Sequence, residues 1–79
     1  MNYEEYVIVG KDNNNDWLIS TIKPSYSNVY ETAICLEGLD DWHIIEEYTT
    51  RELALEGHRK YKEMTDDELN ILSSKPNLR

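Results

Sequence analysis

The chain has 79 residues, of which 39% are hydrophobic and 30% are charged. This length is near the lower limit for one hydrophobic core, which excludes a separate catalytic module. It predicts a single domain over residues 1–74 and a frayed tail over residues 75–79. The net charge of −8 disfavours direct binding to nucleic-acid phosphates or to anionic lipid.

Compartment and assembly follow from hydropathy and from cysteine use. No stretch has the roughly 18 apolar residues of a membrane span, and the first five residues are acidic where a signal peptide is basic. The single cysteine, Cys35, excludes an internal disulfide and is expected to be a small buried side chain. These features predict a cytoplasmic protein with no membrane contact. Because such a core yields only about 3–5 kcal/mol, we also expect self-association, for example as a homodimer.

The first part of the chain predicts two strands. Residues 3–9 end in three β-branched residues before Gly10, and residues 17–23 have strand composition and stop at Pro24. Between them, the polar run over residues 11–16 predicts a loop or hairpin connection, because Asn and Asp tolerate left-handed backbone. Its composition is similar to that of a calcium loop, but the glycine and the distal glutamate of such a loop are missing.

Two further strands are predicted over residues 29–36 and 42–48, joined by a turn that contains Asp40 and Asp41. In the first of these strands, alternate residues share the face that we expect to meet the core: Tyr30, Thr32, Ile34 and Leu36. In the second, the pattern aligns Trp42, Ile44 and Tyr48 on one face. Neighbouring residues such as Glu46 and Glu47 point to opposite faces, so they are no chelating pair.

The last third of the chain predicts two helices. Thr49 and Glu52 match a capping box, as do Thr65 and Glu68, which open a shorter helix that ends before Pro76. One stripe of the first helix can lie on a sheet: Leu53, Ala54, Gly57, His58, Tyr61 and Met64. The fold class is therefore α+β, with an antiparallel sheet of about four strands packed by one C-terminal helix and a short second helix.

His58 is the residue of the stripe with the most chemistry. A buried imidazole needs hydrogen-bond partners, and Glu31, Thr32 or Tyr48 can provide one where the helix crosses the third and fourth strands. We interpret His58 and Glu31 as structural polar residues. The alternative, a catalytic base, rests on His58 with a nearby glutamate and needs a cleft and a second titratable group.

Motifs of catalysis or metal binding are missing from the sequence. There is no P-loop, dinucleotide fingerprint, nucleophile elbow or HExxH helix, so the sequence predicts no enzyme and no cofactor. A zinc site needs several Cys or His ligands, whereas the chain offers Cys35, His43 and His58 without a recognised spacing. No metal site is predicted.

Acidic residues are concentrated in the middle of the chain. Residues 24–56 hold eight acidic residues and one arginine, a net charge of −7. A compact fold is expected to present them as a negative surface that steers basic partners, or else as a solvated face that aids solubility. The residues predicted to bind a partner are Glu37, Asp40, Asp41, Trp42, Glu46 and Glu47.

Several short motifs resemble a family. Tyr30-Glu31-Thr32, Trp42, Glu47-Tyr48-x-Thr50 and Ala54-x-x-Gly57-His58 together look like short uncharacterised proteins from phages and mobile elements of Firmicutes-type bacteria. The resemblance covers about half the chain, and the family has no assigned reaction. It implies expression in the cytoplasm of a bacterial host.

Three functions remain open at this point. The first is a non-enzymatic inhibitor that binds a basic surface of a host defence or regulatory protein, as small anti-CRISPR-like and DNA-mimic proteins do. The second is a dimer that sequesters a signalling nucleotide, whose phosphates require the helix cations Arg51, Arg59, Lys60 and Lys62. The third is an accessory protein of phage assembly.

Overall fold

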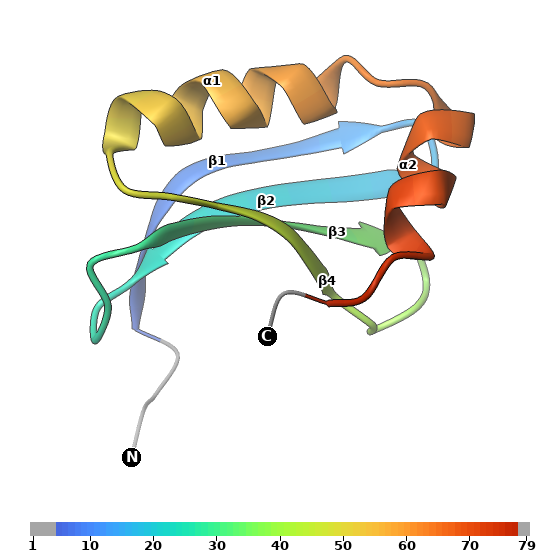
Figure 1. The fold of residues 1–79 in the computed structure, drawn as a ribbon. Coiled ribbons are helices and arrows are strands. Elements are labelled where there is room, and N and C mark those ends of the chain that lie inside the picture. The colour runs from blue at the N-terminus through green and yellow to red at the C-terminus, as the bar shows by residue number, and fades with distance from the viewer. Residues whose placement is uncertain (1–4, 78–79) are drawn as a thin grey trace.

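The computed structural model describes residues 5–77 as an antiparallel sheet followed by two helices (Figure 1). The elements are β1 (Tyr6–Asn14), β2 (Trp17–Pro24), β3 (Tyr30–Leu36), β4 (His43–Tyr48), α1 (Arg51–Lys62) and α2 (Asp66–Ser73). The strands lie in the order β1-β2-β3-β4, so each strand pairs with its neighbour in the chain. This arrangement confirms the predicted α+β class.

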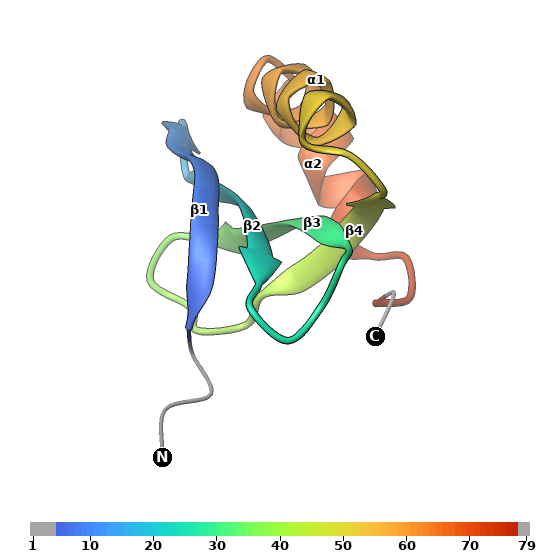
Figure 2. The ribbon, with the colours of Figure 1, turned by 90° about the vertical axis from the view of Figure 1, so that its left-hand side faces the viewer.

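Both helices lie on the same side of the sheet (Figure 2). We call this side the helix-side face; it carries Ile19 and Thr21 of β2 and Thr32 and Ile34 of β3, all with no exposed area. The opposite side, the open face, carries the alternate residues, among them Ser20, Ile22, Ala33 and Ile44. The predicted orientation of Thr32 and Ile34 toward the core is confirmed.

The hydrophobic core fills the space between the helix-side face and the two helices. Trp17, Ile19 and Ile34 of the sheet pack with Tyr61 of α1 and Leu69 of α2. Three partly buried residues complete the cluster: Ile45, Met64 and Leu72. Because each fully buried aliphatic or aromatic side chain contributes roughly 1.5–3 kcal/mol, this cluster is what attaches both helices to the sheet.

The first hairpin is longer than the sequence predicts. The loop expected over residues 11–16 is wrong for its first four residues, because β1 continues to Asn14 and pairs with Trp17. Asn15 adopts a φ of 56° in the remaining turn, which Asn tolerates well. The polar residues can extend the strand because two of them gain partners from α1 and the segment after it: Asp12 bonds His58, and Asn14 bonds the Met64 carbonyl.

Two β-bulges change which side chains face the helices. In β1 the pairing shifts between Ile8 and Gly10, so Ile8 lies on the open face opposite Ile22 whereas Gly10 lies on the helix-side face opposite Thr21. In β4 the pairing shifts around Ile45, since Thr32 pairs with Glu46 but Ala33 pairs with Ile44.

The second bulge overturns one prediction about β4. Trp42 and Ile44 lie on the open face, whereas Tyr48 lies on the helix-side face, so the expected alignment of the three is wrong. Simple alternation fails here because the extra residue, Ile45, reverses it. Glu46 and Glu47 do point to opposite faces, as predicted: they pair with Thr32 and Glu31 respectively.

The helix starts differ in how well the sequence predicts them. The N-cap of α1 is Thr50, whose hydroxyl accepts from the Leu53 amide, so the capping box predicted at Thr49 is wrong by one residue. The capping box of Thr65 and Glu68 at α2 is confirmed. The predicted stripe of α1 is buried at Ala54, Gly57, His58 and Tyr61, but Leu53 is 48% exposed.

The predicted strand residues Tyr3 and Glu4, and the tail residues 78–79, lie outside the described residues. Asn77, in the segment predicted as the tail, bonds the Ile44 amide and the Trp42 carbonyl at 3.3 Å each. No helix within residues 5–77 is long and apolar enough to cross a membrane.

Gly57 allows α1 to approach β4 closely. A Cβ atom at this position would collide with the ring and hydroxyl of Tyr48. Tyr48 is only 7% exposed and bonds the buried Thr32, so its ring has little freedom to move away. The glycine therefore sets the spacing between helix and sheet, despite its cost of roughly 0.5–1 kcal/mol to the helix relative to alanine.

We expect Gly57→Ala to destabilise the protein by about 1–3 kcal/mol, because the clash with Tyr48 outweighs the gain in helix propensity. Urea unfolding measures the difference. Arg59→Ala, an exposed change in the same helix, is the control and is expected to stay within about 0.5 kcal/mol of the wild type. A Gly57→Ala protein that is more stable than the wild type contradicts the close contact.

Candidate functional site

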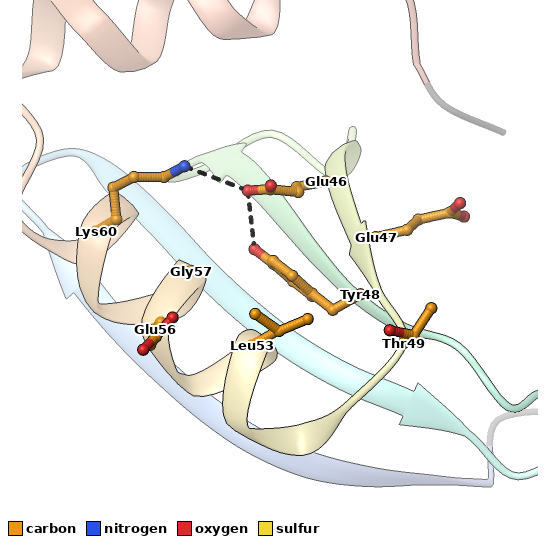
Figure 3. A pocket seen from close by; sticks show the side chains of 8 residues that line it. All are labelled: Glu46, Glu47, Tyr48, Thr49, Leu53, Glu56, Gly57 and Lys60. Carbon is orange, nitrogen blue, oxygen red and sulfur yellow. Dashed lines mark hydrogen bonds and ion pairs between the residues drawn. The ribbon is translucent and has the colours of Figure 1, made fainter.

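An acidic groove of about 390 Å³ lies between the end of β4 and α1 (Figure 3). We call it the β4–α1 groove. Its walls contain three glutamates and one lysine, and its apolar part is formed by a tyrosine ring and a leucine. The lining residues are Glu46, Glu47, Tyr48, Thr49, Leu53, Glu56, Gly57 and Lys60. The spacing of Leu53, Gly57 and Lys60 places them on one side of α1.

Glu46 is the most constrained acidic residue of the β4–α1 groove. Its Oε1 atom accepts from the hydroxyl of Tyr61 at 2.7 Å and from the hydroxyl of Tyr48 at 3.3 Å, and Lys60 Nζ lies 3.4 Å away. The side chain is 37% exposed. All three donors reach Oε1 rather than Oε2, so the carboxylate is held in one orientation while its second oxygen is not used by them.

The two tyrosines beside Glu46 are held in the neutral form. Burial raises the pKa of Tyr48 to about 12, and the charge and hydrogen bond of Glu46 act in the same direction against the bond with Thr32. Burial likewise raises the pKa of Tyr61 well above its ordinary value, and the hydrogen bond to Glu46 adds to the shift. Both phenols therefore keep their protons across the neutral range.

A chain of polar groups, buried except at its ends, runs from the β4–α1 groove to the opposite edge of the sheet. Beyond Tyr48, its members are Thr32, Thr21, His58 and Asp12. His58 Nδ1 lies 2.7 Å from Thr21 Oγ1, and His58 Nε2 lies 2.8 Å from Asp12 Oδ2. We call this series, with Glu46, the polar chain.

The direct partners of His58 differ from those predicted. Thr21 and Asp12 contact the ring, whereas Thr32 and Tyr48 are reached only through Thr21. Glu31 is buried but belongs to the open face, on the other side of the sheet. The reason is the position of α1, which contacts β1 and β2 as well as β3 and β4, and the bulge in β1 that turns Asp12 toward it.

Gly10 makes room for the imidazole. A Cβ atom there would lie 2.7 Å from two ring atoms of His58, so only glycine leaves the ring its place against β1. The hydrogen bond with His58 lowers the pKa of Asp12, and the charges of Lys62 and His58 lower it further against the effect of desolvation. Asp12 is therefore an anion at neutral pH.

Thr21, His58 and Asp12 have the order of hydrogen bonds found in a catalytic triad. The hydroxyl of Thr21 is, however, in a residue with no exposed area, and Thr32 beside it has none either. A substrate cannot reach this oxygen while the sheet and α1 are packed. The geometry therefore fits the predicted structural role of His58.

Five of the six residues predicted to bind a partner are acidic, and they fall into two groups. Glu37, Asp40 and Asp41 lie exposed in the loop over residues 37–42, before β4 begins. Glu46 and Glu47 line the β4–α1 groove near the end of β4, which is about 15–20 Å further along the strand. The sequence therefore predicted two of the groove residues but not their separation from the loop acids.

Trp42 belongs to neither acidic group. It is 36% exposed and lines a hollow of about 360 Å³ on the open face. The other lining residues are Tyr6, Lys11, Ser20, Ile22, Glu31, Ala33 and Ile44. This hollow is more apolar than the β4–α1 groove, and Glu31 lies buried within it.

Other groove residues were missed by sequence reasoning. The sequence pattern assigns Glu56 no role, and it places Tyr61 in the buried stripe of the first helix without a contact to Glu46. The helical spacing of Glu56 and Lys60 alone places these two near one another. The sequence does not show that β4 packs against that side of α1, so it could not place these residues beside Glu46.

The structure shows the position of Cys35 and of the other side chains that could bind a metal ion. Cys35 is buried, as predicted, with Sγ 2.9 Å from the Leu39 carbonyl oxygen. Within residues 5–77, no group of three or more His, Cys, Asp or Glu side chains is arranged to hold a metal ion.

Comparison of the chain with protein-family models, curated proteins and solved structures finds no match. The family resemblance seen in the sequence motifs therefore stays a prediction.

We expect the free energy of unfolding to fall as the pH rises from about 10 to about 12. Tyr48 and Tyr61 ionise near their ordinary pKa of 10.0 in the unfolded chain but only at higher pH in the folded protein. Their contribution is therefore fully present below pH 10 and is lost above it. Urea unfolding at several alkaline pH values measures this slope.

Tyr48→Phe separates this effect from general alkaline denaturation. The variant lacks one of the two shifted phenols, so its stability should depend less steeply on pH between pH 10 and about 12. Equal slopes in the variant and the wild type would contradict the role of Tyr48.

Proposed function

We propose that this chain is a non-enzymatic binding protein that captures a basic side chain of a partner protein in the β4–α1 groove. The observation that carries the proposal is the arrangement of Glu46. Two tyrosine hydroxyls and Lys60 hold one of its oxygens, and Glu56 of α1 lines the same groove, whereas the side chain of Glu47 points away from it (Figure 3). A carboxylate fixed in this way binds a cation with little loss of side-chain entropy.

Arginine is the partner residue that fits this groove best. Its guanidinium group donates in a planar fork that matches a carboxylate, and its aliphatic stem packs on apolar surface. Leu53, which is 48% exposed, and the ring of Tyr48 provide that surface beside Glu46. Lys60, the one cation of the lining, is already engaged by Glu46.

Long-range charge supports the same conclusion. The net charge of −8, concentrated as −7 over residues 24–56, attracts basic proteins before contact is made. The exposed acids of the loop, Glu37, Asp40 and Asp41, contribute to this field from outside the groove. Association is therefore expected to be faster at low salt.

The partner class that we propose is a host defence or regulatory protein with a basic surface that itself binds nucleic acid. In this setting the chain acts as an inhibitor. The sequence resemblance implies that it does so in the cytoplasm of a bacterial host. The acidic protein has no direct contact with nucleic acid; it competes with nucleic acid for the partner.

The positions of the helix cations argue against the alternative that the chain sequesters a nucleotide. Lys60 lies 3.4 Å from Glu46, and Lys62 lies 4.0 Å from Asp12, so both are near carboxylates. Arg51 and Arg59 are exposed on α1 and line neither the β4–α1 groove nor the hollow of the open face. The homodimer and the phage assembly role stay predictions.

The test is an affinity capture from a bacterial host lysate with the tagged full chain, at about 0.05 M and about 0.5 M salt. Bound proteins are identified by mass spectrometry, and their affinity for the purified chain is then measured. We expect a stoichiometric partner that is lost at high salt. The absence of a partner at both salt concentrations would refute the proposal.

A matched pair of variants then distinguishes the groove from the general charge. Glu46→Gln/Glu56→Gln removes two charges from the groove, and Asp40→Asn/Asp41→Asn removes two charges from the loop. We expect the groove variant to bind the partner at least about 10-fold more weakly, since charged hydrogen bonds are lost. The loop variant should change mainly the association rate. Equal losses of affinity in both variants would mean that the groove is not the binding site.

A further inference from the structure

The polar chain links two carboxylates through four groups that both donate and accept. In order, it runs Asp12, His58, Thr21, Thr32, Tyr48 and Glu46. The five successive contacts measure 2.8, 2.7, 2.6, 3.0 and 3.3 Å. Four of these five lie at ordinary hydrogen-bond distances, and the fifth is slightly longer.

Each contact needs one proton, and the neutral groups supply too few. Asp12 and Glu46, as carboxylates, only accept. Between them, a neutral imidazole, two threonine hydroxyls and one tyrosine hydroxyl provide one proton each, which makes four protons for five contacts. With neutral His58, two acceptor atoms in the interior must therefore face each other at hydrogen-bond distance, or the bond from Tyr48 to Glu46 must be lost.

One additional proton fills every contact, and it can reside on His58, on Glu46 or on Asp12. The lowered pKa of Asp12 opposes the last of these. On His58, it lets Nε2 donate to Asp12 while Nδ1 donates to Thr21, and all the hydroxyls then point toward Glu46. On Glu46, it reverses the direction in which the hydroxyl groups donate, so that they point toward His58. Lys60 and the Tyr61 hydroxyl both favour the ionised form of Glu46, so they oppose the second arrangement.

The surroundings of His58 favour the first arrangement. The groups that face the ring are the anion Asp12 and Gly10 from β1 and the hydroxyl of Thr21 from β2. The ammonium group of Lys62 lies 4.0 Å from Oδ1 of Asp12, the oxygen that does not bond His58. An opposite charge at 2.8 Å compensates an imidazolium in this position.

We infer that His58 carries both ring protons in the folded protein at neutral pH, and that it is the positioning residue of the β4–α1 groove. Its proton sets the direction of the polar chain, so that Tyr48 donates to Glu46 and the groove keeps an oriented anion. The consequence for binding rests on the proposed function: the groove prefers a guanidinium or ammonium group over a neutral amide. The protonation of His58 does not rest on it.

The experiment is a nitrogen-15 NMR measurement on the histidine rings of the full chain at pH 7, without any partner. The sequence has two histidines, and His43→Asn assigns their signals. We expect both ring nitrogens of His58 to show the chemical shifts of an imidazolium. A neutral His58 with one protonated nitrogen would overturn the inference.

Three variants test whether the polar chain, rather than Asp12 alone, holds the proton. Thr32→Val divides the chain into segments of two contacts and one contact, and Tyr48→Phe leaves three contacts. In both variants the neutral groups that remain supply one proton for every contact that remains. No additional proton is then needed on His58, so we expect the imidazolium signal at pH 7 to be lost. Tyr61→Phe removes a different tyrosine hydroxyl from Glu46 without changing the count, so its signal should remain.

The outcomes separate this inference from the proposed function. If His58 stays an imidazolium in Thr32→Val and Tyr48→Phe, Asp12 is sufficient and the positioning role is overturned. Measurement on the wild type decides the protonation itself, even where a variant fails to fold. A failed affinity capture would refute the proposed function and would leave the NMR result unchanged.

Discussion

The structure depends on the contact between α1 and the sheet, which is polar at its centre. Where α1 crosses the sheet, hydroxyls and an imidazole replace the aliphatic side chains that usually fill such a layer: Thr21, Thr32, Tyr48 and His58 are all buried. A buried polar group without a partner costs roughly 1–3 kcal/mol, so these groups tolerate only one arrangement of helix and sheet. The apolar cluster around Trp17 and Leu69 supplies attraction, while the polar chain supplies the alignment.

The β4–α1 groove is a consequence of that alignment. Gly57 lets the helix come close enough for Tyr48 to lie beneath it, and the hydroxyl of this tyrosine then reaches both Thr32 and Glu46. The same tyrosine forms part of the groove wall. Core and surface are thus joined through one side chain, which explains how a buried histidine can influence a carboxylate at the edge of the sheet.

The two faces of the sheet differ in their chemistry. The helix-side face ends at its β4 edge in the acidic groove, whereas the open face has an apolar hollow with Trp42 in its wall. The acids that looked like one cluster in the sequence are divided between the groove and the loop over residues 37–42. Under the proposed function, a basic partner would meet a specific site at the groove and only a general field at the loop.

The sequence by itself determined the element order, the α+β class, the capping box at Thr65 and the buried position of His58. These features arise from local signals: strand composition, turn residues and helical spacing. Only the tertiary structure decided which residues meet His58 and Glu46, because the bulges near Gly10 and Ile45 reverse the alternation of side chains in both edge strands. A bulge forms where pairing with the neighbouring strand and packing under α1 are both satisfied, and no local pattern encodes that condition.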